Sequence, residues 1–301
     1  MDNASVYDSA LLGYFTEAVA PAISFAPYAN LFWCTTIPEL AGRELYLHDG
    51  LAALAALHMA DLPSASGPST YLKMAQQRFV SASAGFRTAV SSINAENVVS
   101  TFTFSIIVAI LQIKGGVLAK ELQSFDPLGG FLALRGASQI TKASGPLLLE
   151  SCIESLRRST GPITFSTEDN ANTLIPWLDT LALTADGYAN QEALAYLRLW
   201  LNNLDTWPKA WFQLAWWPAK VSQEYIDRLQ NKEPVSLIIF LYWCAGINSR
   251  YKNWFMAGYT RESLQFVQKH LGPDWNNLVE YPTSAIWNPT EATCSNGQPA
   301  V

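Results

Sequence analysis

The chain has 301 residues and a mass of 33.2 kDa, with half of its residues apolar and 15% charged. This composition excludes an intrinsically disordered chain, which combines low hydrophobicity with high charge. The net charge of −6 and the pI of about 5.1 argue against autonomous nucleic-acid binding, because an acidic protein repels phosphate backbones. Aromatic residues reach 12%, and such side chains bury large areas and line pockets.

Apolar residues recur at helical spacing through the first half of the chain. We expect helices over residues 11–22, with Pro21 bending or ending the first, over 44–62, and over 70–93, after a loop at 64–69. A further helix is expected over 97–114, stopped by Gly115 and Gly116. Asp126 is then a predicted N-cap, with Pro127 at the first position of a helix that runs to about residue 141.

The second half continues the helical pattern. Helices are expected over residues 146–158, 172–186 and 191–205, with a loop at 161–172. An aromatic and proline-rich segment follows at 205–222, where Ser222 caps a short helix. Pro234 then begins a second very apolar helix, and a last clear helix covers 254–271 before Gly272 and Pro273.

Two stretches without charge, residues 97–113 and 235–249, were compared with membrane spans. Both fall short of the roughly 20 apolar residues that a span needs, and both contain Ser, Thr, Gln or Asn. We interpret them as buried central helices of a soluble protein. The sequence shows few alternating runs, no repeat and no linker, so we expect one all-helical globular domain of about ten to twelve helices. Its core should cover residues 8–282, with 283–301 as a flexible tail.

The sequence contains no phosphate-binding loop, no nucleophile elbow and no HExxH motif. Three histidines are too few and too scattered to predict a metal site, and we expect neither metal nor cofactor. Four distant cysteines and an acidic rather than basic N-terminal stretch favour a reducing, intracellular setting, either cytoplasmic or nuclear. No motif identifies a catalytic mechanism.

Three segments, in order, resemble the C-terminal ligand-binding domain of fungal sterol-uptake-control-type transcription factors of the binuclear zinc-cluster class. Residues 47–60, LHDGLAALAALHMA, resemble that family's "LLHALLALSALHLA" helix, and residues 126–140, DPLGGFLALRGASQI, resemble its Leu-Leu-Arg-Gly segment. Residues 216–254 resemble its "WP…FI…DP…ALVILAYYA…WW" pattern, and LGPDW at 271–275 continues the match. The resemblance extends over most of the chain, from about residue 11 to residue 282.

This resemblance implies a helical fold with an apolar pocket that accepts sterol-like molecules. It also implies that the bound molecule keeps the domain inactive in the cytoplasm and that the protein associates with itself. The sequence departs from the family in two ways. It lacks the six clustered cysteines that bind zinc and read DNA, so we do not expect self-sufficient DNA binding. Phe255 also replaces the second family tryptophan. A homodimer, or a heteromer with a related full-length factor, is the expected partner arrangement.

A pocket for a rigid polycyclic ligand needs aromatic walls and one or two polar anchors. The expected walls are Trp216, Trp217, Tyr242, Trp243, Trp254 and Phe255. The same tryptophans can instead be core residues that pack between helices. The expected anchors are Gln112, Tyr242 and Asn248, each of which could equally bond a loop carbonyl, because a buried polar group must be paired.

Three residues are candidates for catalysis: His58, Arg135 and Tyr242. Each could polarise a carbonyl or enol, although His58 is also consistent with a core or cap residue and Arg135 with an ion pair or a helix end. Three hypotheses follow. The protein is a ligand-binding regulator, a cofactor-independent cyclase or isomerase of fungal secondary metabolism that uses the same pocket, or an inert scaffold.

Overall fold

Two helices carry apolar residues on nearly all sides, and the other helices surround them. In helix α15 (Pro234–Arg250), every residue from 235 to 247 is buried. In helix α7 (Val98–Leu118), both faces carry buried side chains such as Phe104, Ile107 and Ile110. Helices with apolar residues on all sides are stable only inside a fold. This confirms both as central helices.

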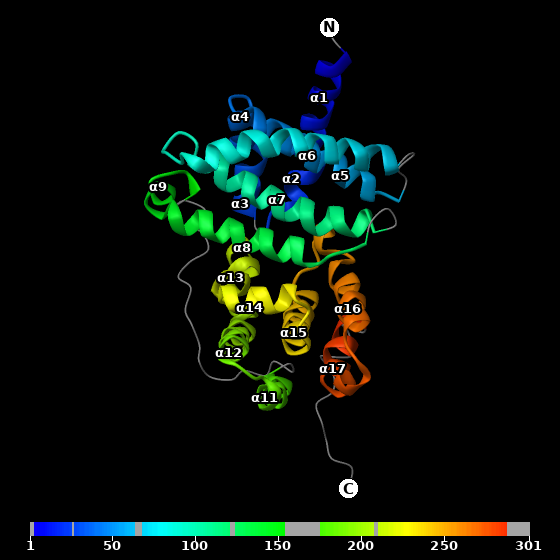
Figure 1. Cartoon of the computed structure of the whole chain (residues 1–301). Helices are drawn as coiled ribbons and strands as arrows, with labels where there is room; N and C mark the ends of the chain where they lie inside the picture. The colour runs from blue at the N-terminus through cyan, green and yellow to red at the C-terminus, as the bar shows by residue number, and fades with distance from the viewer. Residues whose placement is uncertain are drawn as a thin grey trace.

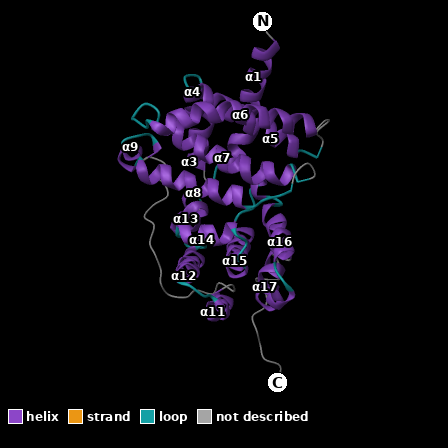
Figure 2. Ribbon diagram, in the orientation of Figure 1, coloured by secondary structure: helices purple, strands orange, loops and turns teal. Residues whose placement is uncertain are grey.

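The computed structural model describes residues 3–25, 27–63, 68–120, 124–153, 175–207 and 210–287. All regular structure in these ranges is helical, as Figure 2 shows, which confirms the predicted all-α class. The first half of the chain forms α1 (Asn3–Tyr14), η1 (Phe15–Val19), α2 (Ala20–Ile23), α3 (Pro27–Leu31), η2 (Phe32–Thr36), α4 (Ile37–Ala41), α5 (Leu45–Asp61), α6 (Pro68–Ser91), α7, α8 (Leu128–Ala143) and α9 (Gly145–Leu149). The second half forms α11 (Ile175–Thr184), α12 (Tyr188–Asn203), α13 (Trp211–Lys220), α14 (Gln223–Gln230), α15, η3 (Trp254–Met256), α16 (Tyr259–His270), η4 (Pro273–Trp275) and α17 (Asn276–Trp287).

Figure 1 shows these helices in two tiers. The long helices α5 to α8 lie across the upper part, with α1 to α4 around them, and α11 to α17 lie below α8. Helix α7 packs against α5, α6 and α8, and α15 packs against α12, α14, α16 and α17. One continuous cluster of buried apolar residues extends from Leu11 in α1 to Ile286 in α17. The two tiers therefore share one core and form a single globular domain.

Helix α7 is the one helix among the described residues that is long and apolar enough to cross a membrane. Of its most apolar 18 residues, 78% are buried inside the protein. That degree of burial is typical of the core helix of a globular protein, because a membrane helix needs a face toward lipid.

Pro21 was predicted either to bend or to end the N-terminal helix. It does not end it, since helical structure runs from Asn3 to Ile23. A π-helical stretch, η1, precedes the proline, and the Ala20 amide donates to the Phe15 carbonyl five residues back. A second π-helical stretch, η2, precedes Pro38 in the same way. Proline clashes with the carbonyl four residues before it, and in both places that carbonyl lies inside the π-helical stretch.

Two helix ends differ from the prediction. Helix α7 continues through Gly115 and Gly116 to Leu118, and the Ala119 amide closes it by donating to the Gly115 carbonyl at 2.9 Å. The expected helix over 254–271 is instead the short η3 and then α16. Gly258 separates them with a φ of +85°, a left-handed conformation that other residues adopt at a cost.

The remaining expectations match more closely. The Ser222 hydroxyl accepts from the Tyr225 amide at 3.2 Å and caps α14, as predicted, and Pro234 begins α15. The Asp126 carboxylate accepts from the Leu128 amide at 2.9 Å, but Pro127 rather than Asp126 is the N-cap residue, so α8 begins one residue later than predicted. Helix α17 continues to Trp287, five residues beyond the expected core. The predicted loop at 161–172, the end of the helix at 146–158 and the rest of the tail lie outside the described residues.

Gly50 allows α5 to approach α7. A Cβ at this position would lie 2.6 Å from the buried ring of Phe104. We expect Gly50→Ala to reduce the free energy of unfolding by about 1–3 kcal/mol, because a packed aromatic ring must move. Urea unfolding measures this change. The control is Gly13→Ala in α1, where a Cβ meets nothing within 4 Å. That variant should be stabilised by roughly 0.5–1 kcal/mol, and equal effects in both would contradict the packing argument.

Candidate functional site

Three hollows among the described residues border α8. The largest of these three, about 570 Å³, lies between α7, α8 and α13, and we call it the aromatic groove. Exposed residues such as Lys142 and Ala219 line it, so it opens to solvent rather than being enclosed. Its lining residues are Phe102, Ile106, Ala109, Leu134, Ala137, Ser138, Gln139, Thr141, Lys142, Trp211, Phe212, Ala215, Trp216, Ala219 and Lys220.

Small and large side chains alternate around the aromatic groove. Ala109, Ala137 and Ala215, one on each of the three helices, leave the space between them. Trp211 and Trp216 provide aromatic walls, and the Trp216 side chain is 6% exposed. A volume in the range of small-molecule sites, with mostly apolar walls and a few polar groups at the rim, suits an apolar ligand.

The charges at this groove are positive. Lys142 and Lys220 belong to its lining, which contains no Asp or Glu among the described residues. The Lys220 ammonium lies over the Trp216 ring, 5.6 Å from its centroid. A lysine stem that lies along an aromatic wall adds apolar contact while its ammonium stays in water.

Helix α13 contributes one face to this groove because of its sequence periodicity. Trp211, Ala215 and Ala219 recur every four residues, and Phe212, Trp216 and Lys220 follow the same spacing one position later. Residues at this spacing share one face of a helix. The predicted aromatic segment at 205–222 therefore contributes to the site, but mainly through Trp211 and Phe212, which were not among the expected wall residues. Recognising that face as a helical one would have found them.

Two of the expected wall residues are core residues. Trp217 and Trp243 have no exposed surface, and both pack against the ring of Phe131, with centroids 5.6 and 5.3 Å away. The Trp217 indole N–H donates to the Ala193 carbonyl at 2.9 Å. Neither residue lines any of the three hollows. The interior at this point is filled by aromatic rings.

The two polar anchors expected on α15 bond the backbone of α17 instead of facing a hollow. The Tyr242 hydroxyl donates to the Leu278 carbonyl at 3.2 Å, and burial raises the pKa of Tyr242. The Asn248 amide donates to the carbonyls of Ala285 and Ile286 at 3.2 Å, and its oxygen accepts from the Thr260 hydroxyl. These bonds attach α17 to α15, so they have a structural role.

The other expected ligand contacts are dispersed. Phe255 is buried and stacks on Trp211 at 5.2 Å, behind the wall of the aromatic groove. Trp254 packs edge-on against the His58 ring at 4.6 Å. Gln112 is an exposed residue of α7, and it lines a different hollow on the other flank of α8. The structure therefore places only Trp216 of the eight expected residues in the lining of the aromatic groove.

Arg135 binds a helix end. Its guanidinium donates to the carbonyls of Pro218 and Val221 at 2.9 and 2.6 Å, where α13 ends. The last carbonyls of a helix lack partners within it, and a cation there also complements the helix dipole. Burial lowers the pKa of Arg135, although a guanidinium stays charged. Arg135 thereby fixes α13 against α8 and shapes the groove without lining it.

We expect Arg135→Met to lower the free energy of unfolding by about 3 kcal/mol, because two carbonyls lose charged donors. Thermal or urea unfolding tests this. Arg87→Met, an exposed position on α6, is the matched control and should change stability by less than about 0.5 kcal/mol. Similar losses in the two variants would show that Arg135 does not hold the end of α13.

His58 belongs to a polar cluster that joins α1, α5, α7 and η3. Its Nδ1 atom lies 2.7 Å from the Tyr14 hydroxyl, and the Trp254 ring covers its other side. One turn away, the buried Lys114 ammonium pairs with Asp61 at 2.7 Å and donates to the Ala257 carbonyl at 3.3 Å. The cluster lines none of the three hollows described above.

Burial lowers the pKa of His58 below its ordinary 6.5, and nearby Lys114 adds to this while Asp61 opposes it. A lowered pKa means that the folded state favours the neutral ring more than the unfolded state does. The stability that His58 contributes is therefore present above the pKa of 6.5 in the unfolded state and is lost as the pH falls. We expect wild-type protein to lose more stability than His58→Gln when the pH drops from about 7.5 to about 5. Urea unfolding at both pH values gives the difference, and equal losses would contradict it.

No known protein-family model matches this chain, and no curated protein matches it either.

Proposed function

We propose that this protein is a regulatory ligand-binding protein that takes up a bulky apolar molecule, such as a sterol, terpenoid or polyketide, in the aromatic groove. The observation that carries the proposal is the groove itself, with about 570 Å³ of space and three aromatic side chains from the 205–222 segment. The regulatory role rests on the sequence resemblance to the fungal sterol-responsive domains.

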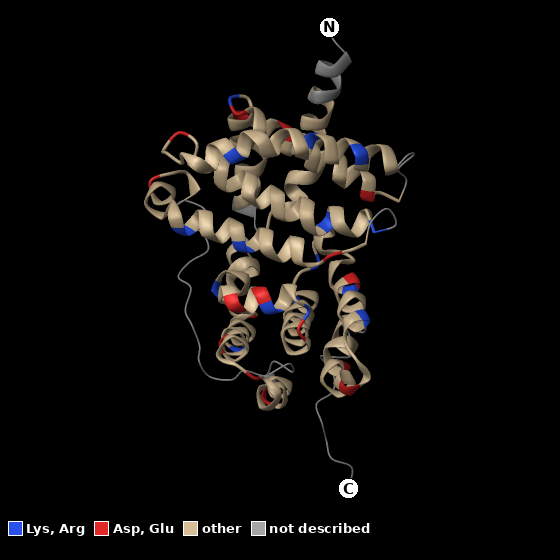
Figure 3. Ribbon diagram, viewed as in Figure 1, with Lys and Arg blue, Asp and Glu red and all other residues tan. Residues whose placement is uncertain are grey.

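The proposal places the contacts differently from the sequence expectation. The ligand would lie against Trp211, Phe212 and Trp216 of α13, with its apolar body over Ala137 and Ala215. Ser138 and Thr141 provide hydroxyl groups at the rim for a ligand hydroxyl or carbonyl. Figure 3 shows few charged positions along α7 and α8, and the charged residues among the described lining of the groove are Lys142 and Lys220.

In this proposal the ligand would act by joining three helices. α13 packs on α8, and α8 packs on α7. A molecule in the groove contacts all three and stabilises whichever arrangement binds it more tightly. Such a change could alter association with another copy or with a related transcription factor, in the cytoplasm or in the nucleus. The enzyme alternative has less support, because Arg135 and Tyr242 are bonded to backbone carbonyls and His58 lies outside the groove.

The test is the binding of dehydroergosterol, a fluorescent sterol, measured by energy transfer from the protein's tryptophans. Wild-type protein should bind, and the double variant Ser138→Leu with Ala219→Leu should bind at least about tenfold more weakly, because two leucine side chains fill the groove. Both positions lie at the rim, so the fold should tolerate the change.

The matched control is Ala133→Leu, which adds the same side chain to α8 outside the groove and should leave sterol binding unchanged. Equal binding by the filled variant and the wild type would place the sterol elsewhere. If dehydroergosterol does not bind and native mass spectrometry of protein from a fungal host finds no apolar molecule, the proposal fails in favour of the inert scaffold.

A further inference from the structure

The other two hollows border successive turns of α7, between α6 and α8, and share no lining residue. One, of about 360 Å³, is lined on α7 by Leu111, Gln112 and two glycines, and the other, of about 450 Å³, by Ser105 and Val108. These α7 positions recur every three or four residues and so share one face of the helix. From residue 105 to residue 116 this face is about 16 Å long. We call the two hollows together the α7 trough.

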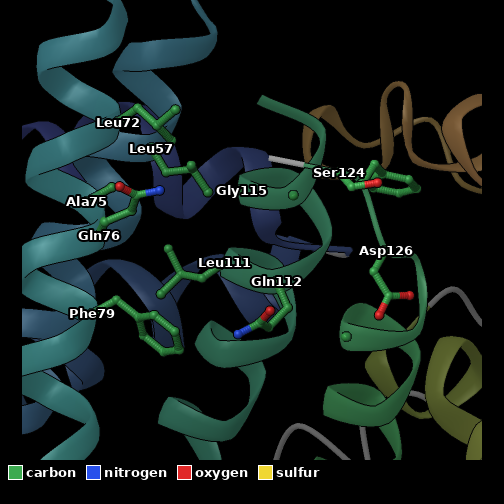
Figure 4. A pocket seen from close by; sticks show the side chains of 13 residues that line it. Leu57, Leu72, Ala75, Gln76, Phe79, Leu111, Gln112, Gly115, Ser124 and Asp126 are labelled. Carbon is green, nitrogen blue, oxygen red and sulfur yellow. The ribbon is translucent and has the colours of Figure 1, made fainter. Parts of the chain in front are cut away.

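Most polar groups of the trough lie at one end. Figure 4 shows Gln76 on the α6 side, Gln112 on α7 and Asp126 on the opposite side, at the start of α8. Ser124, two residues before Asp126, lies on the same side of the hollow. Leu57, Leu72 and Phe79 form an apolar wall at the same end.

The other end is mostly apolar, with Ser105 and Gln139 as its polar side chains. Phe86, Val90 and Ile93 of α6 face Ala133 and Ile140 of α8 across Val108. No charged residue lines this end among the described residues. The trough therefore changes from polar to apolar along its length, which is the pattern of a site for an elongated molecule with a polar head and an apolar tail.

Asp126 determines the sign of the head. It is the one charged residue among the described residues that line the trough. One of its carboxylate oxygens accepts from the Leu128 amide, and Asp126 forms no ion pair with a described residue. A carboxylate with a free oxygen, beside carboxamides and a hydroxyl, attracts an ammonium group and repels a carboxylate.

We propose that the α7 trough binds a long-chain primary amine, with its ammonium group at Asp126 and its alkyl chain along α7 toward Val108 and Ala133. Gln112 and Ser124, which line the same hollow, offer further acceptors on the Asp126 side of Gln76. The net charge of −6 favours the approach of cations from solution. The Asp126 end lies on the opposite flank of α8 from the aromatic groove, whereas the apolar end shares Ala137 and Gln139 with that groove. The proposed amine site does not depend on the proposed function.

Isothermal titration with decylamine, butylamine and decanoate, each below its micelle concentration, tests the proposal. Decylamine should bind and decanoate should not. Butylamine should bind at least about tenfold more weakly than decylamine, because it buries fewer methylene groups and each is worth about fourfold in affinity. Decanoate that binds as tightly as decylamine would overturn the role of Asp126.

Asp126→Asn is the decisive variant, because asparagine keeps an oxygen that accepts from the Leu128 amide while it loses the charge. It should bind decylamine about tenfold more weakly and keep its unfolding midpoint. Asp274→Asn removes the same charge outside the trough and should bind as the wild type does. Unchanged affinity in Asp126→Asn would refute the proposal.

Variants of the two flanks separate this site from the aromatic groove. Ala133→Leu narrows the apolar end and should weaken decylamine but not butylamine. Ser138→Leu with Ala219→Leu fills the aromatic groove and should leave decylamine binding unchanged. Loss of decylamine binding in the groove variant, but not in Ala133→Leu, would move the amine to the aromatic groove and overturn the trough.

Discussion

The burial of two apolar helices is the constraint on which the rest of this structure depends. Every residue from 235 to 247 in α15 is buried, and α7 carries buried side chains on both faces. Neither helix can face water without a large loss of hydrophobic stabilisation. The surrounding helices, α5, α6 and α8 for one and α12, α14, α16 and α17 for the other, form the cover.

The position of α8 follows from this constraint and generates the candidate sites. Helix α8 covers α7 only partly, because it is one cylinder lying on another. Its two flanks leave space, and side chains of different character line that space: tryptophan and alanine beside α13, glutamine and aspartate beside α6. Arg135 keeps one flank open by holding the end of α13. The same helix therefore borders an apolar groove and an amphipathic trough.

Much of the fold could be predicted from the sequence, because helix periodicity and turn residues are local signals. The expected helix over 44–62 corresponds to Leu45–Asp61, and the Ser222 cap and Pro234 start are as predicted. The prediction wrongly ended α7 at Gly115 and Gly116. Glycine has a low helix propensity, but tertiary packing holds these two residues in the helix. Gly258 was missed as a break because its left-handed backbone cannot be distinguished from a tolerated helical glycine in a single sequence.

The site was harder to predict than the fold. A tryptophan that fills a core and one that lines a groove have the same sequence signal, and only packing separates Trp217 and Trp243 from Trp216. Tyr242 and Asn248 are polar residues in a buried helix, as the anchor hypothesis requires, but both donate hydrogen bonds to backbone carbonyls of α17. The helical face that contains Trp211, Ala215 and Ala219 was the usable signal.

The paired π-helical stretches have a consequence for how the N-terminal helices respond to a change in chain length. A π-helical turn holds one more residue than an α-helical turn, so one residue can be removed from it while the packing on both sides is preserved. Phe15–Val19 and Phe32–Thr36 each carry such an extra residue just before a proline. Deleting one residue from either stretch would close it to an ordinary α-helical turn and keep the packing on both sides, whereas the same deletion elsewhere in these helices would turn the preceding part by about 100° relative to the core. The two π-helical turns are thus the places where the N-terminal helices can lose a residue at the least cost in packing.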